Sequence, residues 1–432
     1  MNNKRLNILV IPYIIPYPAN DGGKVCTFGF IDFLRKKHDF TVLFQAYSES
    51  DLKNLEILKA LWPEVTIEVH SYVQRPEEIS LSKAFRNFTL KQLCRLKHKV
   101  LLLAGIRKKE PSTADAYYAM ITGGPANPSN FGFASKISEL VSHSQFDIIQ
   151  VENTENLNLV HLLPSHSKKI FVQFESRFEV LEDYVTSYNL KGKFYEYVIS
   201  NMKFLEHSYF SKYDAIFTLN ESEKDFLKKE LHSEKVFNSP YGILQTDILS
   251  EMPSDNSYYK FTLLGADSHF PNLDALDWYV HELMEPISKI ADFNIEVIGN
   301  WSQENRNKYS SYPKIIFRGF VDDLEVHLKN SILLVPVRIG GGGVRSKILS
   351  AMALGVPVIS TSLAAVGIPS SNKNILLIAD SVEEFCERVS FALNHPEAVL
   401  EMSQVAYQFI NNRYSQKYTS ELREKYYYEI LA

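Results

Sequence analysis

The feature that most constrains this chain is an alternation, kept up along its length, of short apolar runs with longer segments of helical periodicity. Such alternation is typical of parallel β-sheets whose faces are covered by helices. Strands are predicted at 7–11, 41–44, 66–69, 147–151, 169–174 and 215–219 in the first half, and at 260–264, 295–298, 314–317, 332–335, 358–360 and 375–378 in the second. We therefore predict the α/β class, with two Rossmann-like doubly wound sheets.

The boundary between the two sheets is predicted in a turn-rich stretch made of Ser239, Pro240, Tyr241 and Gly242. This divides the chain into domains at 1–240 and 241–405, and the aromatic-rich segment 406–432 is predicted to be a helix. In open α/β sheets ligands bind beyond the carboxyl ends of the strands. Two such sheets facing each other would form one cleft between the domains.

Composition excludes several classes of function. The formal net charge of −5 over 432 residues argues against a nucleic-acid-binding protein, which carries a basic excess. Three widely spaced cysteines offer neither a disulfide framework nor a metal site, and favour a reducing compartment. Pro12, Pro16 and Pro18 interrupt the apolar N-terminus, and no apolar run approaches the roughly 20 residues that a membrane span needs. We expect a cytoplasmic protein.

The sharpest motif lies in residues 331–368, which read as a strand, a glycine turn, a helix, a Gly-x-Pro break and a second strand. The four glycines at 340–343 let the backbone come close to a ligand. The helix predicted from about 344 to 354 then presents free N–H groups and its positive dipole end to an anion. This pattern predicts an anion-binding turn.

Arg345 and Lys347 fall at the start of that helix, where cations oppose the dipole unless a stronger anion is bound. A diphosphate ligand would explain them; a flexible glycine loop with solvated cations is the competing interpretation. A dinucleotide-binding Rossmann turn fits less well. Arg345 stands where that motif needs its third glycine, and the turn comes late in its domain.

This segment resembles the donor-site signature of family 4 retaining glycosyltransferases of the GT-B fold (glycosyl transferases group 1), in the branch with a Gly-Gly-Gly-x-Arg-x-Lys pattern. Weaker resemblances to other loops of the family occur at 16–23, 214–225, 264–272 and 318–324. The resemblance thus extends over nearly the whole chain. It implies two facing Rossmann-like domains, the first on the acceptor side and the second binding the nucleotide sugar, with the C-terminal helix packing back on the first.

The resemblance also implies roles for individual residues. The donor phosphates would be bound by Gly22, Gly23, Gly341, Gly342, Gly343, Val344, Arg345 and Lys347. The donor sugar would lie by the loop carrying His269 and Asn272, although His269 could equally be a plain loop residue. The nucleobase and ribose would contact Phe320, Val321 and Ser350.

The chain departs from the family at two acidic positions. A pair of glutamates eight residues apart is usual, and Gly342 and Ser350 stand in their places. A serine hydroxyl can hydrogen-bond a ribose but supplies no charge. The interdomain Pro-Asn-Gly of the family is Pro240, Tyr241 and Gly242 here.

By resemblance, the chain is expected to be a hexosyltransferase. It would move a hexose-type sugar from a nucleotide-diphosphate sugar to a glycan or lipid-linked acceptor with retention, in bacterial surface polysaccharide or glycoconjugate assembly. No metal and no further cofactor would be needed, because the Gly-loop amides and cations stabilise the leaving diphosphate. Asp322 and Asp323 are therefore interpreted as a helix N-cap in preference to a metal site.

Two carboxylates at predicted strand ends, Glu152 and Glu175, are the catalytic candidates, with a plain surface position as the alternative for each. A basic segment is the candidate membrane contact. Residues 75–109 carry ten basic and two acidic residues, and within 83–109 a leucine face lies beside a stripe of Lys91, Arg95 and Lys99. A basic amphipathic helix can lie on an anionic membrane; a helix packed by its leucines, with a solvated basic face, is the alternative.

Two other functions remain open from the sequence. A non-catalytic homologue of the same fold, serving as a binding or partner subunit, is supported by Ser350. A hydrolysing nucleotide-sugar epimerase would need clustered carboxylates and histidine in the cleft, and the sequence alone shows no such cluster.

Overall fold

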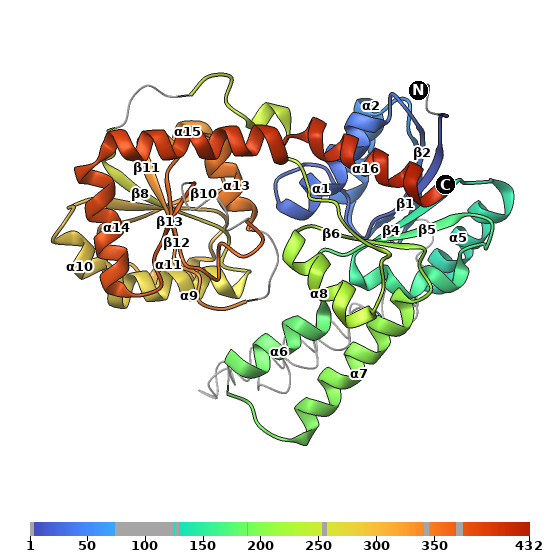
Figure 1. Cartoon of the computed structure of the whole chain (residues 1–432), viewed down its shortest axis with the longest axis horizontal. Helices are drawn as coiled ribbons and strands as arrows, with labels where there is room; N and C mark the ends of the chain where they lie inside the picture. The colour runs from blue at the N-terminus through green and yellow to red at the C-terminus, as the bar shows by residue number, and fades with distance from the viewer. Residues whose placement is uncertain are drawn as a thin grey trace, which may run out of the picture.

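A computed structural model describes residues 4–73, 125, 129–187, 189–252, 257–340, 345–368 and 375–432. Its strands form two separate parallel sheets, one from each half of the chain, with helices packed around each (Figure 1). Most strand residues are buried, as expected for parallel sheets that are covered on both faces. The predicted α/β class with two Rossmann-like sheets is confirmed.

The first sheet has the strand order β3-β2-β1-β4-β5-β6-β7, all parallel within the described residues. Its strands are β1 (Asn7–Ile11), β2 (Asp39–Ala46), β3 (Thr66–Ser71), β4 (Ile148–Glu152), β5 (Lys168–Val172), β6 (Ala215–Thr218) and β7 (Val236–Asn238). The short edge strand β7 was not predicted, because its three residues are too few to give a periodic signal.

The helices of this half begin at polar caps that follow the strands. Asp21, Ser48 and Asn220 accept hydrogen bonds from the first turns of α1, α2 and α8, as N-caps do. The helices are α1 (Gly22–Leu34), α2 (Glu49–Leu61), α5 (Phe131–His143), α6 (Arg177–Ser187), α7 (Lys193–Phe210) and α8 (Glu221–Leu231), with 3₁₀ turns at Thr154–Leu162 and Gln245–Asp247.

The second sheet has the order β10-β9-β8-β11-β12-β13 and is also parallel. Its strands are β8 (Lys260–Leu264), β9 (Asn294–Ile298), β10 (Ile315–Gly319), β11 (Ser331–Val335), β12 (Val358–Ser360) and β13 (Leu377–Ile378). Its helices are α9 (Phe270–Trp278), α10 (Met284–Ser288), α11 (Gln303–Lys308), α12 (Leu324–Leu328), α13 (Ser346–Ala353) and α14 (Val382–Asn394), with a π-helical turn at Tyr279–Leu283.

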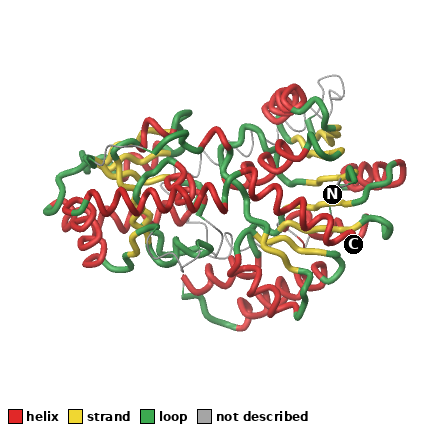
Figure 2. Tube along the Cα trace, turned by 45° about the horizontal axis from the view of Figure 1, so that its top comes forward, coloured by secondary structure: helices red, strands yellow, loops and turns green. Residues whose placement is uncertain are grey.

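The C-terminal end of the chain is two helices where one was predicted. α15 (Pro396–Arg413) packs on α13, whereas α16 (Gln416–Leu431) packs on α1, and the chain turns between them at Tyr414 and Ser415. Figures 1 and 2 show the pair running from one sheet across to the other. The break has a local cause, because Ser415 is extended and caps α16 through the backbone N–H of Tyr418.

The connection between the sheets crosses the start of α16. The strand-like bridge between Ile243 and Ser415 fixes the crossing, and it requires a glycine at position 242. A methyl group on Gly242 would lie 2.4 Å from Oγ1 of Thr419 and 2.7 Å from Cα of Gln416. Within the described ranges, no helix is long and apolar enough to span a bilayer.

Candidate active site between the two sheets

Both sheets reverse their strand order at the same point, between β1 and β4 in the first and between β8 and β11 in the second. The carboxyl ends of strands at such a switch point are where ligands bind in open α/β folds. Gly22 and Gly23 follow β1, His269 and Asn272 follow β8, and Arg345 and Lys347 follow β11. The topology therefore brings the segments that follow β1, β8 and β11 to the carboxyl edges of the two sheets, which face each other.

On the second sheet, the two predicted loops pack closely on each other. The side chain of Asn272 is held by two hydrogen bonds, donating to the carbonyl of Ala266 at 2.9 Å and accepting from Nζ of Lys347 at 2.5 Å. Gly265 has φ +134° beneath it, and a methyl group there would lie 2.3 Å from the amide nitrogen of Asn272. Only glycine fits under Asn272 in this conformation, so the backbone fixes where Lys347 points.

Gly340 makes a second close approach. It has φ +107°, and a methyl group on it would lie 2.8 Å from Cγ of Pro271 and 3.3 Å from Nη2 of Arg345. α13 begins at Ser346, two residues later than predicted, so Arg345 is its N-cap residue and Lys347 lies in its first turn. Two cations are thus held side by side at the positive end of a helix dipole.

This arrangement is electrostatically unfavourable without a bound anion. Loss of hydration, followed by the charge of Arg345, lowers the pKa of Lys347 to about 7. Loss of hydration, followed by the charges of Arg345 and Lys347, lowers the pKa of His269 to about 4. Loss of hydration also lowers the pKa of Arg345. A diphosphate group would relieve all three effects.

Residues of the first half of the chain contact Ser346, which lies between the two cations in sequence. A methyl group on Gly22 would lie 3.2 Å from Cβ of Ser346, so α1 and α13 approach each other at their N-terminal ends. The buried Tyr241 lies beside the same serine. The predicted Gly22–Gly23 turn and the start of α13 therefore face each other across the domain boundary.

Glu175 is the predicted catalytic carboxylate that reaches this place. It follows β5 and is exposed to solvent, yet the surrounding protein raises its pKa, while the charges of Arg177 and Arg345 lower it. Asp183 on α6 also interacts with Arg345, so two carboxylates and two cations share the site.

The family comparison bears on the cation-bearing half of this site. Residues 260–395 match the family model described as glycosyl transferases group 1. This segment is thus similar to a glycosyl transferases group 1 domain. Arg345, Lys347, His269 and Asn272 all lie within it. A comparison with curated proteins finds no match to the chain.

Solved structures resemble the whole chain, including the residues outside 260–395. TarM of S. aureus aligns at 10% identity over 99% of both chains, with a TM-score of 0.63. Sucrose-phosphate synthase of Thermosynechococcus elongatus aligns at 11% over 99% of both, with a TM-score of 0.62. HepE of Anabaena, solved in complex with UDP and glucose, aligns at 10% over 98% of this chain and 100% of its own, with a TM-score of 0.58. The fold is therefore GT-B, as predicted.

Glu152, the other catalytic candidate, is misplaced in the prediction. Its side chain is fully buried on the face of β4 that packs under α1, far from solvent. It accepts hydrogen bonds from Thr27 at 2.5 Å and Gln150 at 2.7 Å, and burial raises its pKa while Arg423 of α16 lowers it. Strand alternation points it inward, so we withdraw its catalytic assignment.

The remaining predicted residues fall at the edges of the site. Phe320 is exposed and Val321 half-buried after β10, while Ser350 is half-buried one turn beyond Ser346 and Lys347 on α13. Asp323 caps α12 through the backbone N–H of Val326, as predicted. Gly341, Gly342, Gly343 and Val344, and the basic segment 83–109, lie outside the described residues.

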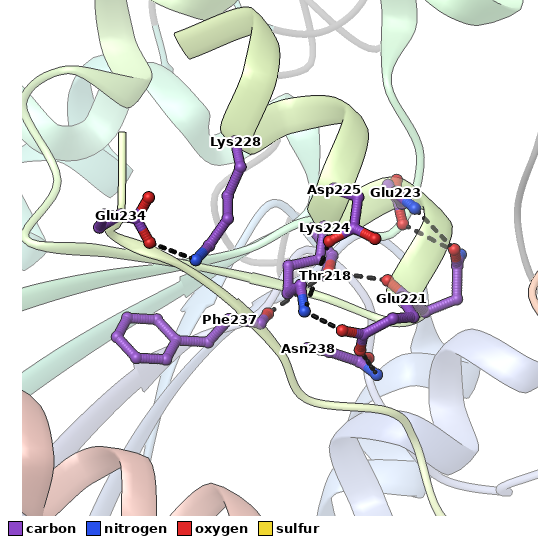
Figure 3. Close-up of polar contacts among 10 residues, drawn as sticks. Thr218, Glu221, Glu223, Lys224, Asp225, Lys228, Glu234, Phe237 and Asn238 are labelled. Atoms are coloured by element: carbon purple, nitrogen blue, oxygen red, sulfur yellow. Dashed lines mark hydrogen bonds and ion pairs between the residues drawn. The ribbon is translucent and has the colours of Figure 1, made fainter. Parts of the chain in front are cut away.

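The sequence did not reveal a group of carboxylates behind Glu175. Burial and neighbouring acids raise the pKa of Glu179 to about 7 and that of Glu223 to about 8, and Asp183 interacts with Glu179. Figure 3 shows Glu223 at the start of α8, beside Glu221 and Thr218. The group draws on segments after β5, within α6 and after β6, and no local motif joins them.

Proposed function

We propose that this chain is a glycosyltransferase that binds a nucleotide-diphosphate sugar between its two domains. The diphosphate would lie against Arg345 and Lys347 at the start of α13, facing the Gly22–Gly23 turn. The observation that carries the proposal is the cation pair itself. Two adjacent, poorly hydrated cations at a helix N-terminus favour the binding of an anion, and the lowered pKa of Lys347, about 7, agrees with this.

The cations would also serve the reaction. Negative charge grows on the leaving diphosphate as the bond to the sugar breaks, and Arg345 and Lys347 stabilise it there. A phosphate oxygen can take the proton of the attacking acceptor hydroxyl, so the new bond forms on the face that the diphosphate leaves. This gives retention without a protein nucleophile. Glu175, next to Arg345, would contact the sugar or the incoming hydroxyl.

Recognition of the nucleoside would use Phe320, Val321 and Ser350. The hydroxyl of Ser350 would bind the ribose where an acidic residue is usual, and so with a weaker, uncharged hydrogen bond. We propose that no metal and no cofactor beyond the donor are needed, since the two cations supply the positive charge. Activity unaffected by EDTA tests this.

The acceptor would be a glycan or lipid-linked glycan and the donor sugar a hexose, as in the assembly of bacterial surface polysaccharide. The site would then face the cytoplasm, with segment 83–109 touching an anionic membrane. Liposome co-sedimentation tests that contact. It is wrong if Lys91, Arg95 and Lys99 can all be changed to Glu without loss of binding.

A thermal-shift screen of UDP, GDP, CDP and ADP tests the donor site. A ligand present at 100 times its Kd stabilises the folded state by about 2.7 kcal/mol, which raises Tm by several degrees. We expect one nucleotide to stabilise the wild type and the Lys289→Met control, whose exposed lysine follows α10 and pairs with Glu285. The same nucleotide should fail to stabilise Lys347→Met. If no nucleotide stabilises the wild type, the chain is a non-catalytic homologue.

One observation favours a second enzyme, a hydrolysing nucleotide-sugar epimerase. Glu179 and Glu223 have pKa values of about 7 and about 8, close to what general acid–base catalysis needs. Epimerisation would exchange a sugar C–H proton with solvent, whereas transfer would not. Mass spectrometry of the sugar after reaction in D₂O separates the two. Deuterium on a ring carbon supports the epimerase; a product without it supports transfer.

A further inference from the structure

Tyrosines follow three neighbouring strands at the carboxyl edge of the first sheet, on the side away from Glu175. Tyr13 comes after β1, Tyr47 after β2 and Tyr72 after β3. Since the strand order is β3-β2-β1-β4-β5, these rings lie along the same edge that leads, through Glu155 after β4, to Glu175 after β5. The site described above uses none of the three.

Two of these rings form a fixed, flat surface. Tyr47 and Tyr72 stack with centroids 4.7 Å apart and planes 4° from parallel. Both hydroxyl groups donate to the same oxygen, Oε1 of Gln45, each at 2.9 Å. The backbone N–H of Tyr47 is held by Asp51 at 2.9 Å, and His70 packs edge-on against Tyr72 at 4.7 Å. The pair is therefore positioned before any ligand arrives.

The surface is open despite this support. The side chain of Tyr47 is 56% exposed and that of Tyr13 is 38% exposed, and Phe131, at the start of α5, is 86% exposed. Gly132 beside Phe131 packs on His70, which places that helix start next to Tyr72. Exposed aromatic rings that are rigidly supported are typical of binding surfaces.

The charges next to Tyr13 are paired with each other, and the carboxylate of Asp51 beside Tyr47 accepts backbone N–H groups. Arg177 is ion-paired with Glu155, and both interact with Tyr13. Tyr47 in turn interacts with Tyr13. A flat aromatic face beside an ion pair that is already satisfied suits a neutral sugar ring. The C–H groups of one ring face would pack on Tyr47, while the hydroxyl groups at the rim would meet the Glu155–Arg177 pair.

We infer that Tyr47, stacked on Tyr72 and flanked by Tyr13, is a binding platform for a neutral sugar ring of an oligosaccharide acceptor. The inference rests on the proposed transferase function and specifies its acceptor. From β2 to β5 there are three strand spacings, about 14 Å. A saccharide that reaches both Tyr47 and Glu175 must therefore extend over more than one ring, and we expect a monosaccharide to bind poorly.

A printed array of neutral mono- and oligosaccharides, probed with the labelled full-length protein, tests this directly. We expect the wild type to bind structures of two or more rings. Tyr47→Ala should weaken that binding at least tenfold, whereas Tyr47→Phe, which keeps the ring and loses only its bond to Gln45, should stay within about threefold. Tyr259→Ala is the matched control, because Tyr259 is 59% exposed, like Tyr47, but lies before the amino end of β8 in the second sheet.

Three results would overturn the inference. The first is a wild-type protein that binds no saccharide, and the second is equal saccharide binding by the wild type and Tyr47→Ala. The third is loss of saccharide binding in both Tyr47→Phe and Tyr47→Ala although both variants unfold like the wild type. Vesicles of phosphatidylcholine and phosphatidylglycerol supply the competing outcome. If Tyr47→Ala lowers binding to vesicles and not to saccharides, the rings contact lipid. The nucleotide screen is independent: its failure removes the donor site and leaves the array result standing.

Discussion

Binding of a nucleotide sugar should draw a proton onto Lys347. The structure holds this lysine in a site that lowers its pKa from an ordinary 10.5 to about 7. A shift of that size corresponds to about 5 kcal/mol against the charged form. A diphosphate beside the lysine supplies opposite charge and returns the pKa toward its ordinary value. The free protein should thus be largely uncharged at this position above pH 7, and the complex charged.

The magnitude follows from the two pKa values. At pH 8 a group with a pKa of about 7 is about 90% unprotonated, so Lys347 should take up about 0.9 proton on binding. Its share falls to about 0.1 at pH 6, where His269, whose lowered pKa of about 4 the diphosphate also raises, adds to the uptake. The affinity should weaken above pH 7, approaching tenfold for each pH unit. The sign is fixed, because the complex binds more protons than the free protein does.

Isothermal titration calorimetry in buffers of different ionisation enthalpy measures this uptake. UDP-glucose and GDP-mannose are suitable probes, since both of their phosphates are esterified and do not titrate between pH 6 and 9. Lys347→Arg keeps the charge without titrating, so above pH 7 its affinity should be independent of pH and its uptake near zero. An uptake below about 0.2 proton at pH 8 in the wild type would refute the reasoning.

Three further predictions concern the site and its frame. Glu175→Gln should abolish most transfer but leave nucleotide affinity unchanged or tighter, because it removes a carboxylate beside Arg345; equal kcat in a product assay would contradict this. Gly242→Ala should lower the free energy of unfolding by roughly 2–4 kcal/mol through its clash with α16, which denaturant titration measures. Glu223 has a raised pKa of about 8, so the folded state binds more protons than the unfolded state between pH 4.5 and 8, and wild-type stability falls across that window as pH rises. The Tm of Glu223→Gln minus that of the wild type should therefore be larger at pH 8 than at pH 5. A Tm difference that is the same at both pH values would argue against this.

The strands could be predicted because their burial is complete. β1, β8 and β12 are found at their predicted limits, and the other predicted strands differ from the observed ones by a few residues at one or both ends. A parallel strand covered on both faces is an unbroken apolar run bounded by polar turns, which needs no partner to be recognised. β7 lacks such a run.

The donor loops could also be predicted from the sequence, because their glycines and cations form short local motifs. Gly340, Asn272 and Lys347 are indeed packed together. Glu152 shows where this reasoning fails. Its position at a strand end is correct, but the side chain lies on the face of the sheet that is covered, and Arg423, which acts on its charge, comes from α16 far along the chain.

The acidic group and the aromatic platform were missed for the same physical reason. Glu179 and Glu223 are brought together by the packing of α6 and α8 around β5 and β6. Tyr13, Tyr47 and Tyr72 come from three separate strand ends. A usable signal was present, because an aromatic residue follows each of the first three predicted strands. The order of those strands in the sheet is what gives that signal meaning.

A crystal structure of the protein grown with UDP-glucose or GDP-mannose tests the central claim most directly. We expect the diphosphate between the start of α13 and the Gly22–Gly23 turn, with phosphate oxygens within hydrogen-bonding distance of the Arg345 guanidinium and of Nζ of Lys347. A nucleotide bound elsewhere, with both cations still turned toward Glu175 and Asn272, would contradict it.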